Sequence, residues 1–293
     1  MMKQKSNFFC KVAPLFLVLA VAIALLFVRP QPANEVIPAA EIPAPPKYQP
    51  PPEDVAIRLP ILVYHHIGHA ETWRDSAYKS LFIEPEWLDE QLKYLKENGF
   101  ESVSFKAVSD FFESGKPLPK RPVLITFDDG NGNNYTNALP ILRKYGFTAT
   151  FFIVTNYTGN GSFMNEEQVH ELVAEGHEIG NHSVSHQKMT ALSDEALARE
   201  ATRSKEILEE LYGIEVTAFA YPFGKYDERV METVRAAGHK TGRSFSGKDA
   251  PTITRGNLLN MPVVSIWGNL PMKTWDKYLF PPTPAPHTPQ SPY

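Results

Sequence analysis

Hydrophobic residues in the middle of the chain recur every three to four positions in several stretches, a spacing that predicts amphipathic helices. Leu88, Leu92 and Leu95 show this spacing between Pro85 and Gly99. Three further helices are expected: one capped by Asn165 that runs to Ala174, one capped by Ser193 that runs to Leu211, and one after Asn133 that Pro140 interrupts and kinks. Each helix would bury one face and leave the other in water.

Short apolar, β-prone runs separate these helices and predict strands. The runs cover residues 61–65, 123–127, 148–154, 178–181, 216–221 and 263–267. A glycine closes each amphipathic stretch before such a run, as expected where a helix ends in the left-handed conformation: Gly99, Gly146, Gly176, Gly213 and Gly238. The alternation of helix and strand indicates an α/β fold with a parallel sheet, open or closed into a barrel. Active residues in such folds follow the carboxyl ends of the strands.

Proline-rich segments lie on both sides of this alternating region. Of the 26 prolines, many fall between Pro30 and Pro52 or between Pro281 and Pro292, where they favour extended, solvated chain. We therefore divide the 293 residues into four parts: an N-terminal membrane anchor or signal (1–29), a linker (30–55), one folded domain (56–280) and a tail (281–293).

The N-terminal part contains an apolar run, Val12–Val28, that three lysines precede and Arg29 ends. At 17 residues the run is just long enough to cross a bilayer, and the lysines favour a cytoplasmic N-terminal end. A cleaved signal peptide is the alternative, although the residues after the run make a poor cleavage site. Both interpretations export the domain. We expect a single-pass protein of a bacterial inner membrane with its domain in the periplasm or outside the cell.

Charge and cysteine content narrow the chemistry. The formal charge is −4 and no block of Lys and Arg stands out in the folded domain, which argues against a nucleic-acid partner. The single cysteine, Cys10, precedes the apolar run, so the domain has neither a disulfide nor a thiolate metal site. Any metal ion there must be bound by His, Asp and Glu. Protein partners and the oligomeric state stay open.

Two acidic residues follow the strand predicted at 123–127. Asp128 and Asp129 would repel each other unless a cation or a proton offsets their charges. Gly130 lets the chain turn so that both carboxylates face one site. The alternative is a polar turn with an aspartate cap.

Two histidines follow the strand predicted at 178–181, in the segment His182-Ser183-Val184-Ser185-His186. On a helix or a tight turn, imidazoles four residues apart face the same side, which is the arrangement of a shared metal ion. The alternative is a pair of surface histidines, but the acidic pair at an equivalent strand end makes a metal site the better interpretation.

A third motif, Tyr221-Pro222-Phe223-Gly224, also follows a predicted strand. Alone it is an ordinary turn; in an active site it would present a backbone N–H to a developing oxyanion. The three motifs in this order resemble the polysaccharide deacetylase family, carbohydrate esterase family four, over roughly residues 60–270. Thr-Phe-Asp-Asp-Gly followed by His-Ser-x-x-His is the specific part of the resemblance. It implies a distorted (β/α) barrel that removes N- or O-acetyl groups from sugar polymers.

Carried over position by position, the resemblance implies that Asp129, His182 and His186 bind a divalent metal ion. Asp128 would be the general base, taking the proton from a water that the metal polarises, and the Phe223 N–H would stabilise the oxyanion. Two histidines and one aspartate accept zinc, cobalt, nickel or iron, and zinc is the ion we expect.

The sequence departs from the usual family pattern in two places. An arginine usually precedes the third loop, and Ala220 stands there; the usual late Leu-x-His, which provides the general acid, is absent, since the final histidine, His287, lies in the tail. However, Leu62-Val63-Tyr64-His65-His66 resembles the circularly rearranged branch that includes biofilm poly-N-acetylglucosamine deacetylases. We therefore assign His65 as the general acid, while His66 would point to the opposite face of an extended strand. A strand-end histidine bonded in the core is the alternative for His65.

These residues, together with the resemblance, predict a metal-dependent hydrolase that removes N-acetyl groups from an amino-sugar polymer, such as a poly-N-acetylglucosamine-like polymer or peptidoglycan; which polymer stays open. The alternatives are a catalytically silent carbohydrate-binding protein of the same fold and a deacetylase of a lipid-linked or small amino-sugar. Aromatic rings stack well on sugar faces, and the candidates are Trp73, Tyr78, Trp87, Trp267 and Trp275. Because most aromatics at such spacing belong to the core, we assign none of them.

Overall fold

A parallel sheet forms the centre of the fold, with the strand order β10-β9-β8-β7-β6-β2-β12 and with β5 beside β6. The computed structural model describes residues 48–70, 76–245 and 252–266, together with Pro46, Trp275 and Leu279. The strands are β1 Ala56–Arg58, β2 Ile61–Tyr64, β3 His66–Ile67, β4 Phe82–Ile83, β5 Glu101–Ser102, β6 Pro122–Phe127, β7 Thr150–Ile153, β8 Glu178–Asn181, β9 Ala218–Ala220, β10 Thr241–Arg243, β11 Thr252–Thr254 and β12 Val264–Ser265.

The sheet curls so that its two end strands approach each other. Arg243 of β10 bridges to Met261, and the chain then continues into β12, which pairs with β2. The pairing is thin in places, since β8 and β9 meet through the single pair Asn181 and Phe219. Two small pairs, β1 with β11 and β3 with β4, lie outside the main sheet. This architecture confirms the predicted distorted (β/α) barrel.

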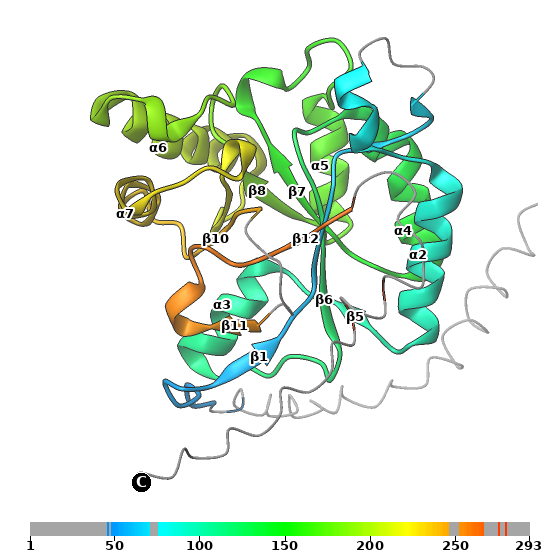
Figure 1. Ribbon diagram of the computed structural model, residues 1–293, viewed down its shortest axis with the longest axis horizontal. Coiled ribbons are helices and arrows are strands. Elements are labelled where there is room, and N and C mark those ends of the chain that lie inside the picture. Colours follow the sequence, from blue (N-terminus) through cyan, green and yellow to red (C-terminus); the bar gives the residue numbers. More distant parts are fainter. Residues whose placement is uncertain are drawn as a thin grey trace, which may run out of the picture. The chain divides into compact units, whose positions relative to one another are not determined.

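Helices cover the strands (Figure 1). They are α2 Pro85–Glu97, α3 Phe105–Ser114, α4 Leu139–Tyr145, α5 Glu166–Ala174, α6 Asp194–Tyr212 and α7 Glu228–Ala236, with 3-10 turns η2 Ser76–Leu81, η4 Thr155–Tyr157, η5 Met189–Ala191, η6 Pro222–Gly224 and η7 Arg255–Asn257 and a π-helical segment η3 Asn134–Ala138. In Figure 1, α2 and α4 lie on one side of the central strands and α6 and α7 on the other.

The local signals for helix ends behave as the sequence indicated. The Asn165 side chain accepts a hydrogen bond from the Gln168 N–H in a capping box, and the Ser193 hydroxyl oxygen accepts one from the Ala196 N–H. The five glycines expected at helix ends, from Gly99 to Gly238, all have positive φ. Helix ends were therefore set by residues within one turn of the end.

Pro140 interrupts the helix after Asn133, as predicted. The chain stays helical into α4, but the residues just before Pro140 form the π-helical segment η3, and the Leu139 N–H bonds to the Asn134 carbonyl. Proline has no N–H to donate and crowds the preceding turn, so regular α-helical bonding is broken there. Most strands are shorter than predicted; the run 148–154, for example, pairs over Thr150–Ile153.

Two faces of the sheet bury different clusters. In β6 all six residues are buried, and Val123, Ile125 and Phe127 pack with residues of α2, α4 and α5. Leu124 packs in the other cluster, with Ile61 and Val63 of β2 and residues of α3. Side chains alternate along a strand. Thr126 in β6, Asp128 just after β6 and His65 just after β2 therefore lie on the same face as Leu124, Ile61 and Val63.

The predicted anchor Val12–Val28, most of the proline-rich linker and the tail 281–293 lie outside the described residues. The described residues from 48 onward belong to one compact unit, Lys47–Tyr293. Within the part of the chain that the structure describes, no helix is long and apolar enough to cross a membrane.

Candidate active site

The carboxyl ends of the strands surround a cavity of about 510 Å³. All six residues that the sequence analysis assigned to roles line it, so the three motifs and the first strand converge on one place. The lining residues are His65, Tyr78, Ser80, Leu81, Asp128, Asp129, His182, His186, Phe223 and Phe245. Burial differs among the acidic pair: Asp128 is 1% exposed, whereas the Asp129 side chain is 20% exposed.

Asp129, His182 and His186 form a set with metal-ligand geometry. Asp129 Oδ1 lies 3.5 Å from Nε2 of His182 and 3.5 Å from Nε2 of His186. Ligand atoms about 2.0–2.2 Å from a tetrahedral zinc ion would lie about 3.3–3.6 Å apart. The two distances from Asp129 fit a divalent ion, all three ligand atoms lie within 4.8 Å of one another, and two imidazoles with one carboxylate leave positions open for water and substrate.

Hydrogen bonding and burial set the tautomer of His182 and the protonation states of His186 and Asp129. His182 Nδ1 donates to the Ala220 carbonyl at 2.7 Å, which leaves Nε2 with its lone pair toward Asp129. Burial, and after it His182, lowers the pKa of His186 to about 4 although the Asp129 charge opposes the shift, so the His186 ring is neutral at pH 7. Burial alone would raise the pKa of Asp129, but the neighbouring side chains, His182 first among them, hold that pKa below its usual range.

The histidine pair lies on a loop, not on a helix. Residues 182–186 form a bend, and His186 has φ 56°. The four non-glycine residues with positive φ in the described chain, Asp129, Ser183, His186 and Phe223, all belong to this site or to its loop. Such conformations cost free energy and persist where the surroundings enforce them, often at functional sites. Gly130, with φ 73°, completes the turn after the acidic pair.

Arg243 is a site residue that the sequence analysis missed. Its guanidinium forms an ion pair with Asp128, and both side chains are 1% exposed. Arg243 at the end of β10 is the register partner of Ala220 in β9, the position where the family usually carries an arginine. The neighbouring strand therefore supplies the missing guanidinium. The one signal available was Gly238, which closes an amphipathic stretch shortly before Arg243, but no strand was predicted there.

Burial lowers the pKa of Arg243 to about 9, which still leaves it charged at neutral pH. The adjacent Asp128 carboxylate favours the charged form further. The guanidinium also packs 4.7 Å from the centre of the Phe152 ring. Arg243 therefore places a buried positive charge in contact with the Asp128 carboxylate.

His65 and His66 lie on opposite faces of the chain, as predicted. His65 Nε2 lies 3.8 Å from Asp128 Oδ2, and its ring stacks 6.0 Å from that of Phe245. The His66 ring instead stacks on Phe82 at 4.5 Å and is not among the residues that line the cavity. Burial lowers the pKa of His65 to about 4, although the Asp129 charge opposes that shift.

The aromatic candidates fall into different environments. Tyr78 lines the cavity and is 51% exposed, whereas Trp275 is 1% exposed in the core. Trp87 is partly buried and packs against the core cluster that contains Val123, Ile125 and Phe127. Trp73 and Trp267 lie outside the described residues.

Comparisons with known proteins agree with this site. Residues 115–242 match the family model described as polysaccharide deacetylase. The Bacillus subtilis protein YxkH is 31% identical over 185 residues, 63% of each chain. A poly-beta-1,6-N-acetyl-D-glucosamine N-deacetylase of Staphylococcus aureus is 27% identical over 209 residues, 64% of this chain and 72% of that one.

A solved structure shows the same fold. The Streptococcus pyogenes deacetylase PplD in complex with acetate superposes with a TM-score of 0.69 at 26% identity, covering 77% of this chain and 99% of that one. The matched family model spans β6, β7, β8 and β9, which carry the acidic pair, the histidine loop and the third motif. Through this domain, the chain is similar to members of the polysaccharide deacetylase family.

Proposed function

We propose that the domain is a metal-dependent hydrolase that removes N-acetyl groups from an amino-sugar polymer. The observation that carries this proposal is the meeting, in one cavity, of a three-ligand metal set with a separate buried carboxylate and imidazole, Asp128 and His65. Metal-assisted amide hydrolysis combines these two functions, a Lewis acid at the carbonyl and groups that move protons. A protein that only bound sugar would need neither.

The metal ligands, Asp128 and His65 have separate roles in the proposed reaction. A divalent ion held by Asp129, His182 and His186 would supply Lewis-acid activation of the acetyl carbonyl and of a water. Asp128, fixed by Arg243, accepts the proton of the attacking water. His65 Nε2, 3.8 Å from Asp128 Oδ2, is placed to pass the proton that Asp128 takes up on to the leaving amine. The products are acetate and a glucosamine unit.

The third motif contributes from the rim. Phe223 has φ 57° and lines the cavity, and its ring lies 4.6 Å from that of His186. We propose that its backbone N–H stabilises the oxyanion of the tetrahedral intermediate. The left-handed conformation of Phe223 would be the means by which the loop aims that N–H.

An extended glycan fits the rim better than a small amino-sugar. Four large hydrophobic side chains are exposed among the described residues, and two of them, Tyr78 and Phe223, border this cavity. Exposed rings beside a catalytic cavity are suited to stack on the faces of neighbouring sugar units. The name of the Staphylococcus aureus relative makes poly-β-1,6-N-acetylglucosamine the first polymer to test.

The proposed stacking of sugar units on Tyr78 can be tested with substrates of different chain length. Tyr78→Ala should lower kcat/KM on an N-acetylglucosamine hexamer by about 2- to 12-fold, from about 0.5–1.5 kcal/mol of stacking. The same variant should leave activity on the monomer near wild type. Tyr78→Trp keeps an aromatic face and should keep the preference for the hexamer. Equal losses on both substrates would contradict a stacking role.

The proposed activity is tested by acetate release from the metal-loaded, full-length protein. The panel comprises poly-β-1,6-N-acetylglucosamine, peptidoglycan and chitin oligomers, with Asp128→Asn as the inactive control. We expect acetate from at least one polymer. Metal binding without acetate from any member would instead favour the carbohydrate-binding alternative.

We also propose that Val12–Val28 carries the domain out of the cytoplasm. The support is the apolar run, its preceding lysines and the proline-rich spacer that follows. Fractionation and N-terminal sequencing of the mature protein distinguish an anchor from a cleaved signal. A cytoplasmic location would contradict export altogether.

A further inference from the structure

The loop between the two histidine ligands is itself neither helix nor strand, and its carbonyls at Ser183 and Val184 accept the backbone N–H groups of Thr155 and Asn156 in η4. It places His186 in a left-handed conformation, and its backbone N–H groups need acceptors from elsewhere in the fold. Within the loop itself, the Ser183 hydroxyl oxygen accepts the His186 N–H at 2.9 Å. The N–H groups in the middle of the loop are bound by a different element.

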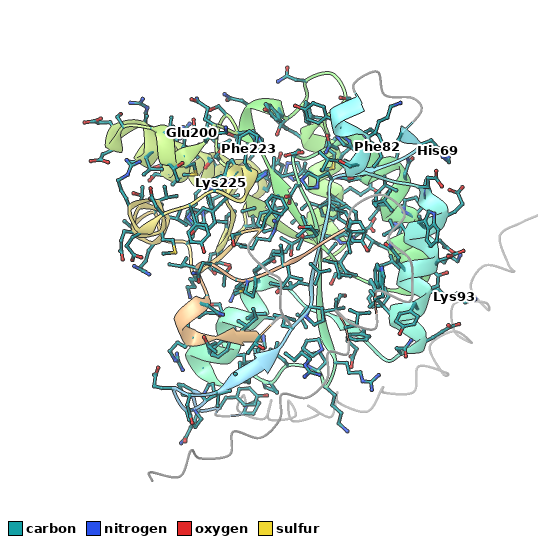
Figure 2. All side chains as sticks on the ribbon, in the orientation of Figure 1. His69, Phe82, Lys93, Glu200, Phe223 and Lys225 are labelled. Carbon is teal, nitrogen blue, oxygen red and sulfur yellow. The ribbon has the colours of Figure 1, made fainter. Side chains whose placement is uncertain are left out.

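Glu200, in the second turn of α6, provides those acceptors (Figure 2). Its Oε2 accepts the N–H of Val184 and the N–H of Ser185, both at 2.9 Å. Its Oε1 accepts the Ser185 hydroxyl at 2.6 Å. Glu200 is 8% exposed, so these three bonds are largely shielded from water.

We propose that Glu200 is a positioning residue for the metal site. By binding the centre of the loop, it holds His186 where its Nε2 lies 3.5 Å from Asp129 Oδ1. Without Glu200, two sheltered N–H groups would lose their acceptor and the loop would relax toward other conformations. His186 would then reach the ligand position only part of the time, and metal affinity would fall. This inference rests on the metal site in the proposed function, not on the deacetylation.

The chain offers a matched control in Glu178. Its carboxylate also accepts two backbone N–H groups, those of Phe105 and Lys106 at 2.8 and 2.9 Å, and one hydroxyl, that of Thr150 at 2.7 Å. Glu178 begins β8, whereas the ligand loop follows its end, about 13 Å further along an extended strand of four residues. Both glutamates thus make the same kinds of bonds, and one of them binds the ligand loop.

The test measures metal affinity directly. Full-length apo wild type, Glu200→Ala, Glu200→Gln and Glu178→Ala are titrated with zinc against a chromophoric chelator, and each apo variant is also melted thermally. We expect Glu200→Ala to bind zinc about 10- to 100-fold more weakly, the range seen when the partner of a metal ligand is lost. Glu200→Gln keeps an oxygen for the two N–H groups but loses the charge that strengthens those bonds, so its zinc affinity should lie between those of wild type and Glu200→Ala.

Glu178→Ala should lower the melting temperature without changing zinc affinity. Wild-type affinity in folded Glu200→Ala would overturn the proposal, as would an equal loss of affinity in Glu178→Ala, which would show general destabilisation. If Glu200→Ala does not fold, Glu200→Gln decides: a melting temperature that falls with no change in affinity would overturn the positioning role. Because zinc binding is read without substrate, these results stand whether or not acetate is released.

Discussion

Replacing Arg243 with methionine removes the buried cation that faces the proposed base. Arg243 and Asp128 are each 1% exposed and form an ion pair, so the variant leaves a carboxylate buried without its partner. Breaking such a pair typically costs about 3–5 kcal/mol. Methionine retains much of the aliphatic volume beside Phe152, so the added cost of a cavity should be small.

For a domain of this size, about 2–4 °C of melting temperature is lost per kcal/mol. We therefore expect Arg243→Met to melt about 6–20 °C below wild type. Turnover should fall by about 10²–10⁴-fold, the usual contribution of a general base, because the Asp128 carboxylate loses the group that fixes it. Zinc content should be unchanged, since Arg243 bonds to none of the three ligands.

The double variant Arg243→Met with Asp128→Leu makes the test specific. Replacing both members of a buried pair by apolar groups is often neutral or stabilising. We expect the double variant to recover most of the lost stability while it stays inactive. Thermal melts and acetate release measure the two effects separately. A single variant as stable as wild type, or a double variant less stable than the single, would refute the reasoning.

Three further outcomes are expected. Asp129→Ala and His182→Ala should each lose most of the metal and nearly all activity, and full occupancy with normal turnover in either would rule out the ligand set. His65→Ala should keep the metal but be slower by about 10²–10⁴-fold, whereas His66→Ala should stay near wild type; the reverse result would put the wrong face of the strand in the site. Burial lowers the pKa of His239 to about 4 from 6.5, so the unfolded chain takes up its proton first and stability should fall as the pH drops from 6.5 toward 4. Urea unfolding across that range should show a shallower fall in His239→Gln, and an unchanged slope would contradict this account.

Short-range patterns in the sequence were enough for much of the fold and the site. The caps at Asn165 and Ser193 depend on bonds three residues long, so the residues at those ends suffice to predict them. The order of strands along the barrel follows their order in the chain from β6 to β10. Because the carboxyl ends of parallel strands share one edge, motifs at those ends were bound to meet, and the acidic pair met the histidine loop as expected.

Contacts between distant residues could not be predicted in the same way. Arg243 replaces the expected arginine because β10 pairs with β9 in a register that sets it opposite Ala220. Glu200 binds a loop fifteen and sixteen residues before it because α6 packs beside β8. Both contacts depend on how strands and helices pack in three dimensions, and no local pattern of hydrophobic and polar residues encodes that packing. The residues proposed to carry the chemistry could therefore be identified along the chain, whereas the partners that hold them could be identified only in the folded structure.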